Sequence, residues 1–390
     1  MSPRILLVVG TRPEAIKLAP VVQALRAAGQ PVELLSTGQH REMLDQALSC
    51  FGLRPDIDLG LMARDQSLSE LVTRVVTGVD TILRERPPGL LVVQGDTTTT
   101  FASSLAAFHR RVPVAHVEAG LRSFDRAQPF PEEVNRRLTT VLADLHLAPT
   151  PLAKERLLAE GVAAERIAVT GNTVVDALVQ IVAALPASEA APIVALPADA
   201  RVVLATIHRR ESWGAELEGV CQALGRLVDR FADVHVVLPV HLNPNVREPV
   251  HRSLGGRERV HLLPPVDYLQ FVHLLRRATL VVTDSGGVQE EAPSLGKPLL
   301  LLRHVTERPE AFAAGAALLV GTDPDRIVAE ASRLLEDPAA YRAMTGVPNP
   351  YGDGRAAGRV VEAIERFLAG EVPVLEASRE FRPESPASSR

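Results

Sequence analysis

Cysteine is scarce in this 390-residue chain, which has only two, Cys50 and Cys221. They lie far apart and match no metal-binding spacing, so we expect neither a disulfide framework nor a cysteine metal site. No apolar run is long enough to cross a bilayer. The first apolar run ends at Gly10 and has the length of a strand rather than of a signal peptide. These absences predict a cytoplasmic protein that does not span a membrane.

The sequence also lacks an excess of positive charge. Its formal net charge of -5 argues against a protein that binds nucleic acid non-specifically. Hydrophobic residues make up 46% and charged residues 23% of the chain, a composition typical of a soluble globular protein. The length predicts two domains. Short apolar runs alternate with helical periodicity in both halves, and an Ala- and Pro-rich segment at 186–197 separates them, which predicts an α/β fold class with parallel sheets.

Residues 280–298 carry the clearest local pattern, a buried strand followed by a glycine turn and a short helix. The turn contains Ser285, Gly286 and Gly287 after Asp284. Unpaired N–H groups at a helix start attract anions, and glycine without a Cβ lets a phosphate approach the backbone. The stretch therefore predicts a binding site for a nucleotide phosphate. An ordinary strand-to-helix turn is the alternative.

Charged side chains follow several predicted strands of the first half. Arg12 and Lys17 lie at the start of a helix, where positive charge is unfavourable unless an anion offsets it. Asp96 follows strand 90–93, Glu118 follows strand 112–117, and Glu132 begins the next helix. Ligands of open α/β sheets bind at the carboxyl ends of strands, so the convergence of three carboxylates there favours function. Helix caps and solvated charges are the alternatives.

The second half repeats the pattern, and His208 follows its first strand, 201–207. Its neighbours Arg209 and Arg210 disfavour protonation, whereas a bound diphosphate would favour it. We therefore expect His208 to contact a ligand. A structural or exposed histidine is the alternative.

Together these motifs closely resemble the non-hydrolysing UDP-N-acetylglucosamine 2-epimerases of bacteria, over about residues 4–368. The matching segments are GTRPEAIKLAP (10–20), TGQHREMLDQ (37–46), QGDTTTT (94–100), HVEAGLRS (116–123), PFPEEVNRR (129–137), GNTVVDAL (171–178), HRRES (208–212), PVHLNPNVREPV (239–250), TDSGGVQEEAPSLGKP (283–298), TERPEA (306–311) and NPYGDG (349–354).

The resemblance implies two facing Rossmann-like domains of the GT-B type with the active site in the cleft between them. The first domain would span residues 1–172 and the second, UDP-binding domain 173–354. A final helix at 355–369 would cross back to the first domain. The tail at 370–390 is rich in Pro, Ser and Glu, lies outside the resemblance and is predicted to be disordered.

The resemblance also implies the activity, the reversible conversion of UDP-N-acetylglucosamine to UDP-N-acetylmannosamine without a metal or nicotinamide cofactor. The route would eliminate UDP to give 2-acetamidoglucal and then add UDP back. The matching catalytic positions are Asp96, Glu118, Glu132 and His208. The matching substrate-binding positions are Arg12, Lys17, Asp96, Glu118, His208, Phe271, Ser285, Gly286, Gly287, Glu291 and Arg308.

Partners follow from the same resemblance, which implies a UDP-sugar substrate and a homodimer. Family members can bind a second UDP-N-acetylglucosamine, and Gln39, Arg41, Arg209 and His241 are candidates for such an allosteric site. Solvating the cleft is the alternative role for these four. Three other functions stay open: an epimerase for a modified sugar such as a 2,3-diacetamido uronic acid nucleotide, a GT-B glycosyltransferase, and a UDP-sugar-binding sensor.

Overall fold

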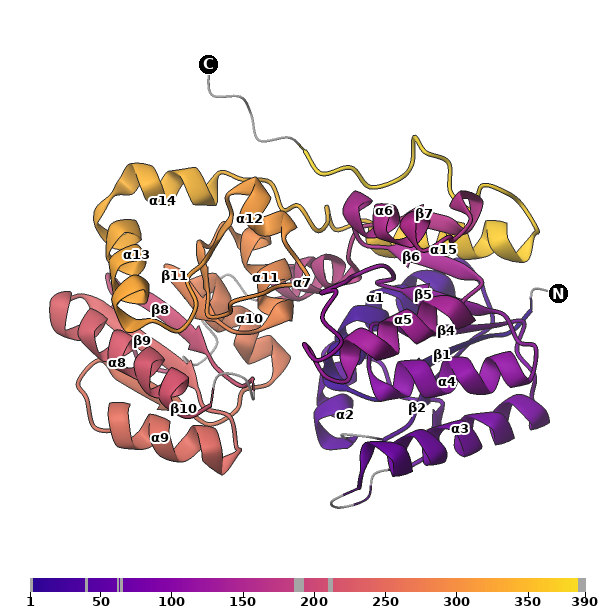
Figure 1. Cartoon of the computed structure of the whole chain (residues 1–390), viewed down its shortest axis with the longest axis horizontal. Helices are drawn as coiled ribbons and strands as arrows, with labels where there is room; N and C mark the ends of the chain where they lie inside the picture. The colour runs from indigo at the N-terminus through magenta and orange to yellow at the C-terminus, as the bar shows by residue number, and fades with distance from the viewer. Residues whose placement is uncertain are drawn as a thin grey trace. The chain divides into compact units, whose positions relative to one another are not determined.

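The computed structural model describes residues 3–38, 41–61, 63, 66–185, 193–209 and 213–384. The chain divides into two compact units (Figure 1). Unit 1 contains Met1–Gln180 and Tyr351–Pro383, and unit 2 contains Ile181–Pro350. The first boundary falls inside helix α7 (Thr173–Ala184), whereas the sequence placed it just before that helix.

In its described residues, unit 1 has a seven-stranded parallel sheet in the order β3-β2-β1-β4-β5-β6-β7. Its strands are β1 (Ile5–Val9), β2 (Val32–Ser36), β3 (Ile57–Asp58), β4 (Leu90–Gln94), β5 (Val114–Val117), β6 (Leu145–Ala148) and β7 (Ile167–Val169). Its helices are α1 (Arg12–Ala27), α2 (Arg41–Ser49), α3 (Leu68–Glu85), α4 (Thr98–His109), α5 (Glu132–Leu142), α6 (Pro151–Ala159), the short 3-10 helix η1 (Ala164–Arg166), α7 and α15 (Ala356–Leu368).

Unit 2 has a parallel sheet in the order β10-β9-β8-β11-β12-β13. Its strands are β8 (Arg201–Thr206), β9 (Val234–Pro239), β10 (Val260–Leu263), β11 (Leu280–Thr283), β12 (Leu299–Leu301) and β13 (Ala317–Leu319). Its helices are α8 (Ala215–Arg230), α9 (Pro244–Leu254), α10 (Tyr268–Arg277), α11 (Gly286–Glu291), η3 (Ala292–Leu295), α12 (Glu310–Ala314), α13 (Pro324–Glu336) and α14 (Pro338–Thr345). Both units are therefore of the predicted Rossmann-like α/β type.

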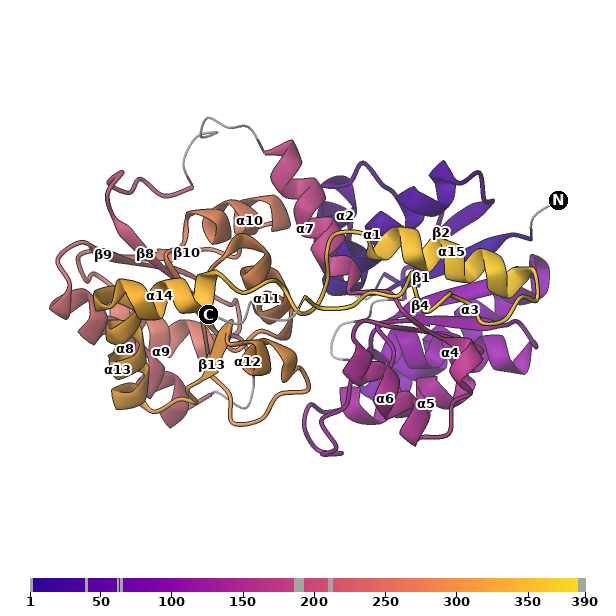
Figure 2. The same ribbon diagram turned by 90° about the horizontal axis from the view of Figure 1, so that it is seen from above.

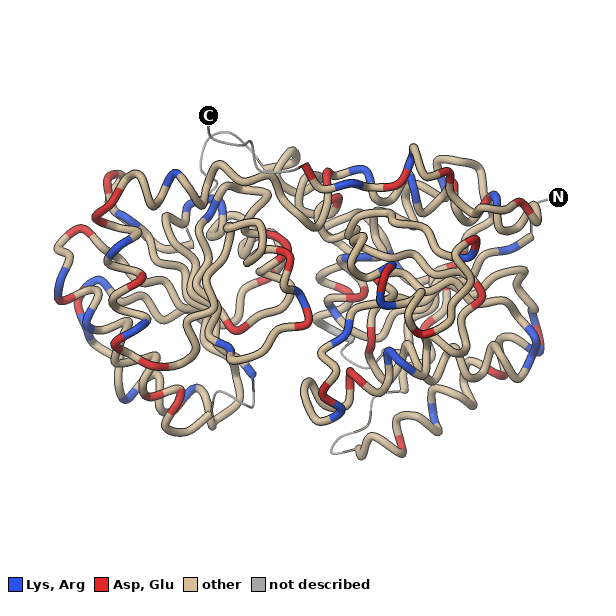
Figure 3. The backbone as a smooth tube through the Cα atoms, turned by 45° about the horizontal axis from the view of Figure 1, so that its top comes forward, with Lys and Arg blue, Asp and Glu red and all other residues tan. Residues whose placement is uncertain are grey.

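Apolar burial on both faces of each sheet explains these elements. The strands β1 and β4 are buried along their whole length, as their continuous apolar runs predict. On α3, Leu71, Val75 and Val79 recur at helical spacing and pack against the sheet in one core cluster. Charged residues concentrate on the helices and loops around the strands (Figure 3). No helix in the described ranges is long and apolar enough to cross a membrane.

The strand order places a topological switch point in each sheet. Chain connections run in opposite directions on either side of the β1–β4 pair in unit 1 and of the β8–β11 pair in unit 2. Loops after such strand pairs diverge and leave room for a ligand at the carboxyl edge. Functional residues are therefore expected in the loops that follow these two strand pairs.

The C-terminal segment corrects one prediction, because residues 370–384 are not disordered. After α15, which packs against α1 (Figure 2), the chain runs along unit 1 and buries Val374, Leu375 and Phe381. The Phe381 N–H donates to the Val169 carbonyl of edge strand β7 at 2.8 Å. The Pro, Ser and Glu content of the tail predicted disorder, but the three apolar side chains are buried against the folded unit and order the segment.

Candidate active site

At the switch point of unit 1, the buried carboxylate of Glu14 joins the loop after β1 to the turn after β4. Its Oε2 accepts the backbone N–H groups of Gly10 and Thr11 at 2.8 and 2.6 Å, while Oε1 accepts hydroxyl groups of Thr97 and Thr100 at 2.5 and 3.1 Å. Burial raises the pKa of Glu14 despite these hydrogen bonds. The contacts fix the start of α1, which Arg12 begins, against the turn that carries Asp96.

Glu118 follows β5 in a left-handed backbone conformation, with φ of 66°. Such a conformation is costly for a residue other than glycine and is concentrated at functional sites. The buried carboxylate accepts Lys17 Nζ, Gln94 Nε2 at 2.9 Å and Asn172 Nδ2 at 3.2 Å, all at Oε2. Lys17 is itself 6% exposed, so the two charges form a buried pair. The predicted site residues Lys17 and Glu118 are therefore in direct contact.

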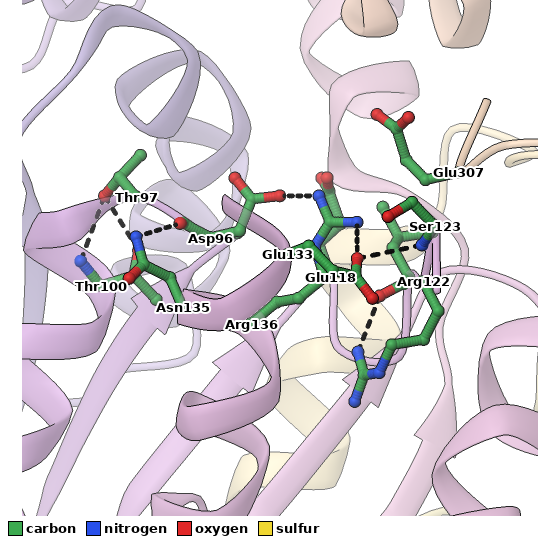
Figure 4. Close-up of polar contacts among 12 residues, drawn as sticks. Asp96, Thr97, Thr100, Glu118, Arg122, Ser123, Glu133, Asn135, Arg136 and Glu307 are labelled. Carbon is green, nitrogen blue, oxygen red and sulfur yellow. Dashed lines mark hydrogen bonds and ion pairs between the residues drawn. The ribbon is translucent and has the colours of Figure 1, made fainter. Parts of the chain in front are cut away.

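Asp96 lies in the turn after β4, next to the end of β5, and helix α5 clamps it (Figure 4). The Arg136 guanidinium donates to Asp96 Oδ2 and, at 3.0 Å, to Glu133 Oε2. Asn135 Nδ2 donates to the Asp96 carbonyl at 3.1 Å. Glu132 is the first residue of the same helix. The structure thus brings Asp96 next to the helix that begins with Glu132.

Two buried histidines lie beneath this edge on adjacent strands. His116 of β5 pairs in register with His146 of β6, and His116 Nε2 lies 2.7 Å from the Gly95 carbonyl. Burial lowers the pKa of His116 to about 4 and that of His146 to about 3. Both rings are neutral near pH 7, so His116 donates its Nε2 proton and fixes the turn that precedes Asp96.

At the switch point of unit 2, buried Asp284 joins the turn after β11 to the loop after β8. Its Oδ2 accepts the backbone N–H groups of His208 and Arg209 at 2.9 and 2.8 Å, and its Oδ1 lies 2.9 Å from His208 Nδ1. Burial alone would raise the pKa of Asp284, but His208 and the two N–H groups outweigh it, so the pKa is lowered. Asp284 is thus an anionic anchor for His208.

The turn into α11 meets a cluster of buried charges. Ser285 is the N-cap residue, followed by Gly286 and Gly287. A Cβ on Gly286 would lie 2.9 Å from Arg308 Nη1 and would force that guanidinium to shift, whereas a Cβ on Gly287 would meet Ser285 Oγ at an ordinary 3.9 Å. Arg308 donates to Glu290 Oε1 at 2.7 Å and also pairs with Glu307. The Arg308 guanidinium therefore restricts the space for a side chain at position 286.

The other predicted residues of unit 2 lie close by. The buried Glu291 carboxylate accepts the Tyr268 hydroxyl at 2.8 Å, and Phe271 is buried one turn further along α10. His241 is exposed, and its Nδ1 accepts the Asn243 N–H at 3.1 Å. Burial and the neighbouring His208 lower the pKa of His241.

A family profile described as UDP-N-acetylglucosamine 2-epimerase matches residues 23–365. The chain belongs to this epimerase family. The UDP-N-acetylglucosamine 2-epimerase of Escherichia coli K12 is 51% identical over 371 residues, which cover 93% of this chain and 98% of that protein. The enzyme of Salmonella typhimurium LT2 is 50% identical over 371 residues, covering 93% and 99%. A crystal structure of the Neisseria meningitidis 2-epimerase bound to UDP-GlcNAc is 44% identical with a TM-score of 0.90, covering 93% of this chain and 100% of that chain.

Membership of the 2-epimerase family confirms the resemblance found in the motifs. Of the candidate allosteric residues, Gln39 lies outside the described residues, and Arg41 begins α2 with a side chain that also lies outside them. Arg209 Nη2 lies 4.0 Å from Glu307 Oε1. In this family member the described residues contain no group of three or more His, Cys, Asp or Glu placed to hold a metal.

Sequence reasoning missed four charged residues that hold the site together: Glu14, Glu133, Arg136 and Asp284. Glu14 carried a signal, since Thr11 and Glu14 form a capping box at the start of α1. The sequence pattern predicts only a turn position for Asp284. Glu14, Arg136 and Asp284 each bind at least one group that lies far away in the sequence. A single sequence does not show which distant residues come into contact.

Proposed function

We propose that the chain interconverts UDP-N-acetylglucosamine and UDP-N-acetylmannosamine by epimerisation at carbon 2. One observation carries the proposal: Asp96 and Glu118 follow adjacent parallel strands in a chain that is 51% identical to the E. coli 2-epimerase. Both carboxylates belong to the edge of the sheet where open α/β folds bind ligands. A binding protein needs no such arrangement of acid–base groups.

The chemistry explains why carboxylates are needed. The hydrogen on carbon 2 is far too weakly acidic for a carboxylate to remove, because the neighbouring carbon 1 is an acetal centre. Breaking the bond from carbon 1 to the UDP oxygen creates an oxocarbenium-like centre that acidifies this hydrogen. Loss of the proton gives UDP and 2-acetamidoglucal. Re-addition of UDP to carbon 1 and of a proton to the other face of carbon 2 gives the epimer.

Residues of unit 1 would handle the sugar. Removing a proton from one face and returning one to the other requires two proton-transfer groups, for which Asp96, Glu118 and Glu132 are the candidates. Lys17 Nζ donates to the buried Glu118 carboxylate, an arrangement suited to stabilising positive charge on the sugar ring. We assign the two proton transfers to Asp96 and Glu132.

Residues of unit 2 would handle the nucleotide. Ser285 caps α11 and Gly286 and Gly287 begin it, and their backbone N–H groups are suited to the departing diphosphate. His208 and Arg308 of unit 2 add positively charged or proton-donating groups, and Arg12 of unit 1 is a further candidate for the diphosphate. The aromatic ring of Phe271 suits the uracil and Glu291 the ribose hydroxyl groups, as the family motif implies.

Incubation with UDP-N-acetylglucosamine as the sole substrate tests this function. We expect proton NMR to show the anomeric signal of UDP-N-acetylmannosamine growing until equilibrium, and growing about 100-fold or more slowly with Asp96→Asn. A glycosyltransferase would require an acceptor, and an epimerase for a modified sugar would turn over the 2,3-diacetamido uronic acid nucleotide instead. Either of those outcomes would contradict the proposal. The product would supply N-acetylmannosamine-type precursors for cell-surface polysaccharide, made in the cytoplasm where nucleotide sugars form.

We also propose that the chain is a homodimer. Support comes from apolar side chains on the outer faces of α4 and α5, two helices that pack together. Phe108 is 60% exposed, Leu138 42% and Val141 81%. Exposed apolar side chains on neighbouring helices are typical of a surface that another protein chain covers. Light scattering at micromolar concentration should give twice the chain mass, and Val141→Lys should reduce it to one. A wild-type monomer would refute the dimer.

Regulation by a second UDP-N-acetylglucosamine remains a proposal for Gln39, Arg41, Arg209 and His241. Such a ligand would favour the active form and promote its own turnover and the reverse reaction. UDP-N-acetylmannosamine alone would then react after a lag that a trace of its epimer abolishes. Equal initial rates with and without added UDP-N-acetylglucosamine would remove this role.

A further inference from the structure

Helix α5 holds Asp96 through an arrangement of charges that family membership does not explain. The Arg136 guanidinium is 3% exposed and lies between two carboxylates, those of Asp96 and Glu133 (Figure 4). Its Nη2 donates to Asp96 Oδ2 and its Nη1 to Glu133 Oε2 at 3.0 Å. One guanidinium therefore fixes the orientation of Asp96 relative to the start of α5.

Glu133 anchors this guanidinium from the other side. Its side chain is fully buried, and it accepts the backbone N–H groups of Ser123 and Phe124 at 2.9 and 3.2 Å. These residues begin the loop that follows Glu118 and leads to α5. Glu133 thus ties Arg136 to the loop, and a buried Glu paired with a buried Arg is costly to break from either side.

The geometry also leaves one carboxylate oxygen of Asp96 available to a ligand. Its side chain is 22% exposed, and within the described residues Oδ1 accepts no hydrogen bond while Oδ2 is held by Arg136. The backbone of the same residue is held by Asn135 Nδ2. A carboxylate that is fixed by one oxygen and open at the other is oriented for proton transfer.

We propose that Arg136 is a positioning residue for Asp96, and that Glu133 keeps Arg136 in place. This rests on the proposed function, in which Asp96 acts on the sugar. Arg136 does not touch the substrate; it aims Asp96 Oδ1 and acts on the rate only through Asp96. Because α5 begins with Glu132, one helix sets the placement of two of the three proposed catalytic carboxylates.

The test compares Arg136→Met with Arg137→Met, a matched control on the same helix whose side chain is exposed. A misplaced reacting group costs about 100-fold in rate. We expect Arg136→Met to lower kcat by roughly that factor with KM changed by less than about threefold, and Arg136→Lys to recover part of the loss. Glu133→Gln should lower kcat in the same direction by a smaller factor. Arg137→Met should keep the wild-type kcat.

The double variant separates positioning from a merely structural role. If Arg136 works through Asp96, then adding Arg136→Met to Asp96→Asn should cost nothing further, because the carboxylate it aims is already gone. A further loss of similar size in the double variant, or a normal kcat in Arg136→Met, would overturn the inference. Should Arg136→Met fail to fold by circular dichroism, the same comparison is made with Arg136→Lys. Wild-type turnover in the same assay keeps this result distinct from a failure of the proposed function.

Discussion

Acid should destabilise unit 1 through its two buried histidines, and the effect of His146 is separable by substitution. In an unfolded chain a histidine takes up a proton below a pKa of 6.5, whereas the folded values are about 4 for His116 and about 3 for His146 because of burial. A group with a lowered folded pKa contributes stability above its unfolded pKa, and loses it as the pH falls toward the folded value. The loss therefore begins near pH 6.5.

The size of the effect follows from the same values. At about pH 5 an unfolded histidine is almost fully protonated while His146 in the fold is neutral, which costs about 1.4 kcal/mol for each pH unit below 6.5, or about 2 kcal/mol. His116 contributes a similar amount. Burial raises the pKa of Asp176 to about 6, so that carboxyl group changes stability in the opposite direction over part of this range. Asp176 is present in wild type and variant alike, so a comparison of the two cancels it.

The assay is native-state hydrogen exchange at the β5 and β6 amides, which reports the opening free energy of unit 1 after correction for intrinsic rates. Between about pH 7.5 and pH 5 the wild type should lose about 2 kcal/mol more than His146→Gln, which takes up no proton. His109→Gln, at an exposed position, serves as the control and should follow the wild type. Equal losses in wild type and His146→Gln would refute the reasoning that this histidine is buried and neutral.

Three further predictions concern the site and the C-terminal segment. Turnover should fall by about 100-fold or more, with the fold unchanged by circular dichroism, in each amide variant of the proposed catalytic carboxylates: Asp96→Asn, Glu118→Gln and Glu132→Gln. A near-normal kcat in one of them would remove that residue from the mechanism. Gly286→Ala should displace Arg308 and cost about 1–3 kcal/mol of stability by thermal unfolding, whereas Gly287→Ala should cost much less; equal costs would contradict the steric argument. Phe381→Ala should abolish exchange protection of the residue-381 amide while kcat stays at the wild-type value, and retained protection would show that the ring does not hold the segment.

Much of the fold is predictable from local sequence. Continuous apolar runs such as that of β1 are typical of parallel strands buried on both faces, and the structure places buried strands where those runs occur. The two-residue strand β3 carries no such run, so no local pattern predicts it. The segment after α15 was wrongly predicted to be disordered from its Pro, Ser and Glu content. Local sequence does not reveal its order, because the place it binds beside β7 exists only once the sheet has formed.

The candidate site was predictable to the extent that strand ends could be found. Asp96, Glu118 and His208 follow strands, and a parallel sheet gathers such residues at one edge within each unit. The charged residues that hold the site together are less predictable from the sequence. Glu132 and Glu133 are adjacent in sequence, and only the folded helix shows that Glu133 turns inward to Arg136 and the loop N–H groups. The local sequence predicts only a turn at Asp284, because its partners, the N–H groups in the loop after β8, lie far away in the sequence.

Incorporation of deuterium at carbon 2 tests the central claim most directly. UDP-N-acetylglucosamine is incubated with the protein in D2O, and product and recovered substrate are examined by proton NMR and mass spectrometry. Elimination and re-addition predict that UDP-N-acetylmannosamine forms with one solvent-derived deuterium at carbon 2, and that stopped reactions contain UDP and 2-acetamidoglucal. Full turnover to a product that keeps the original hydrogen at carbon 2, with neither species released, would contradict the proposed mechanism.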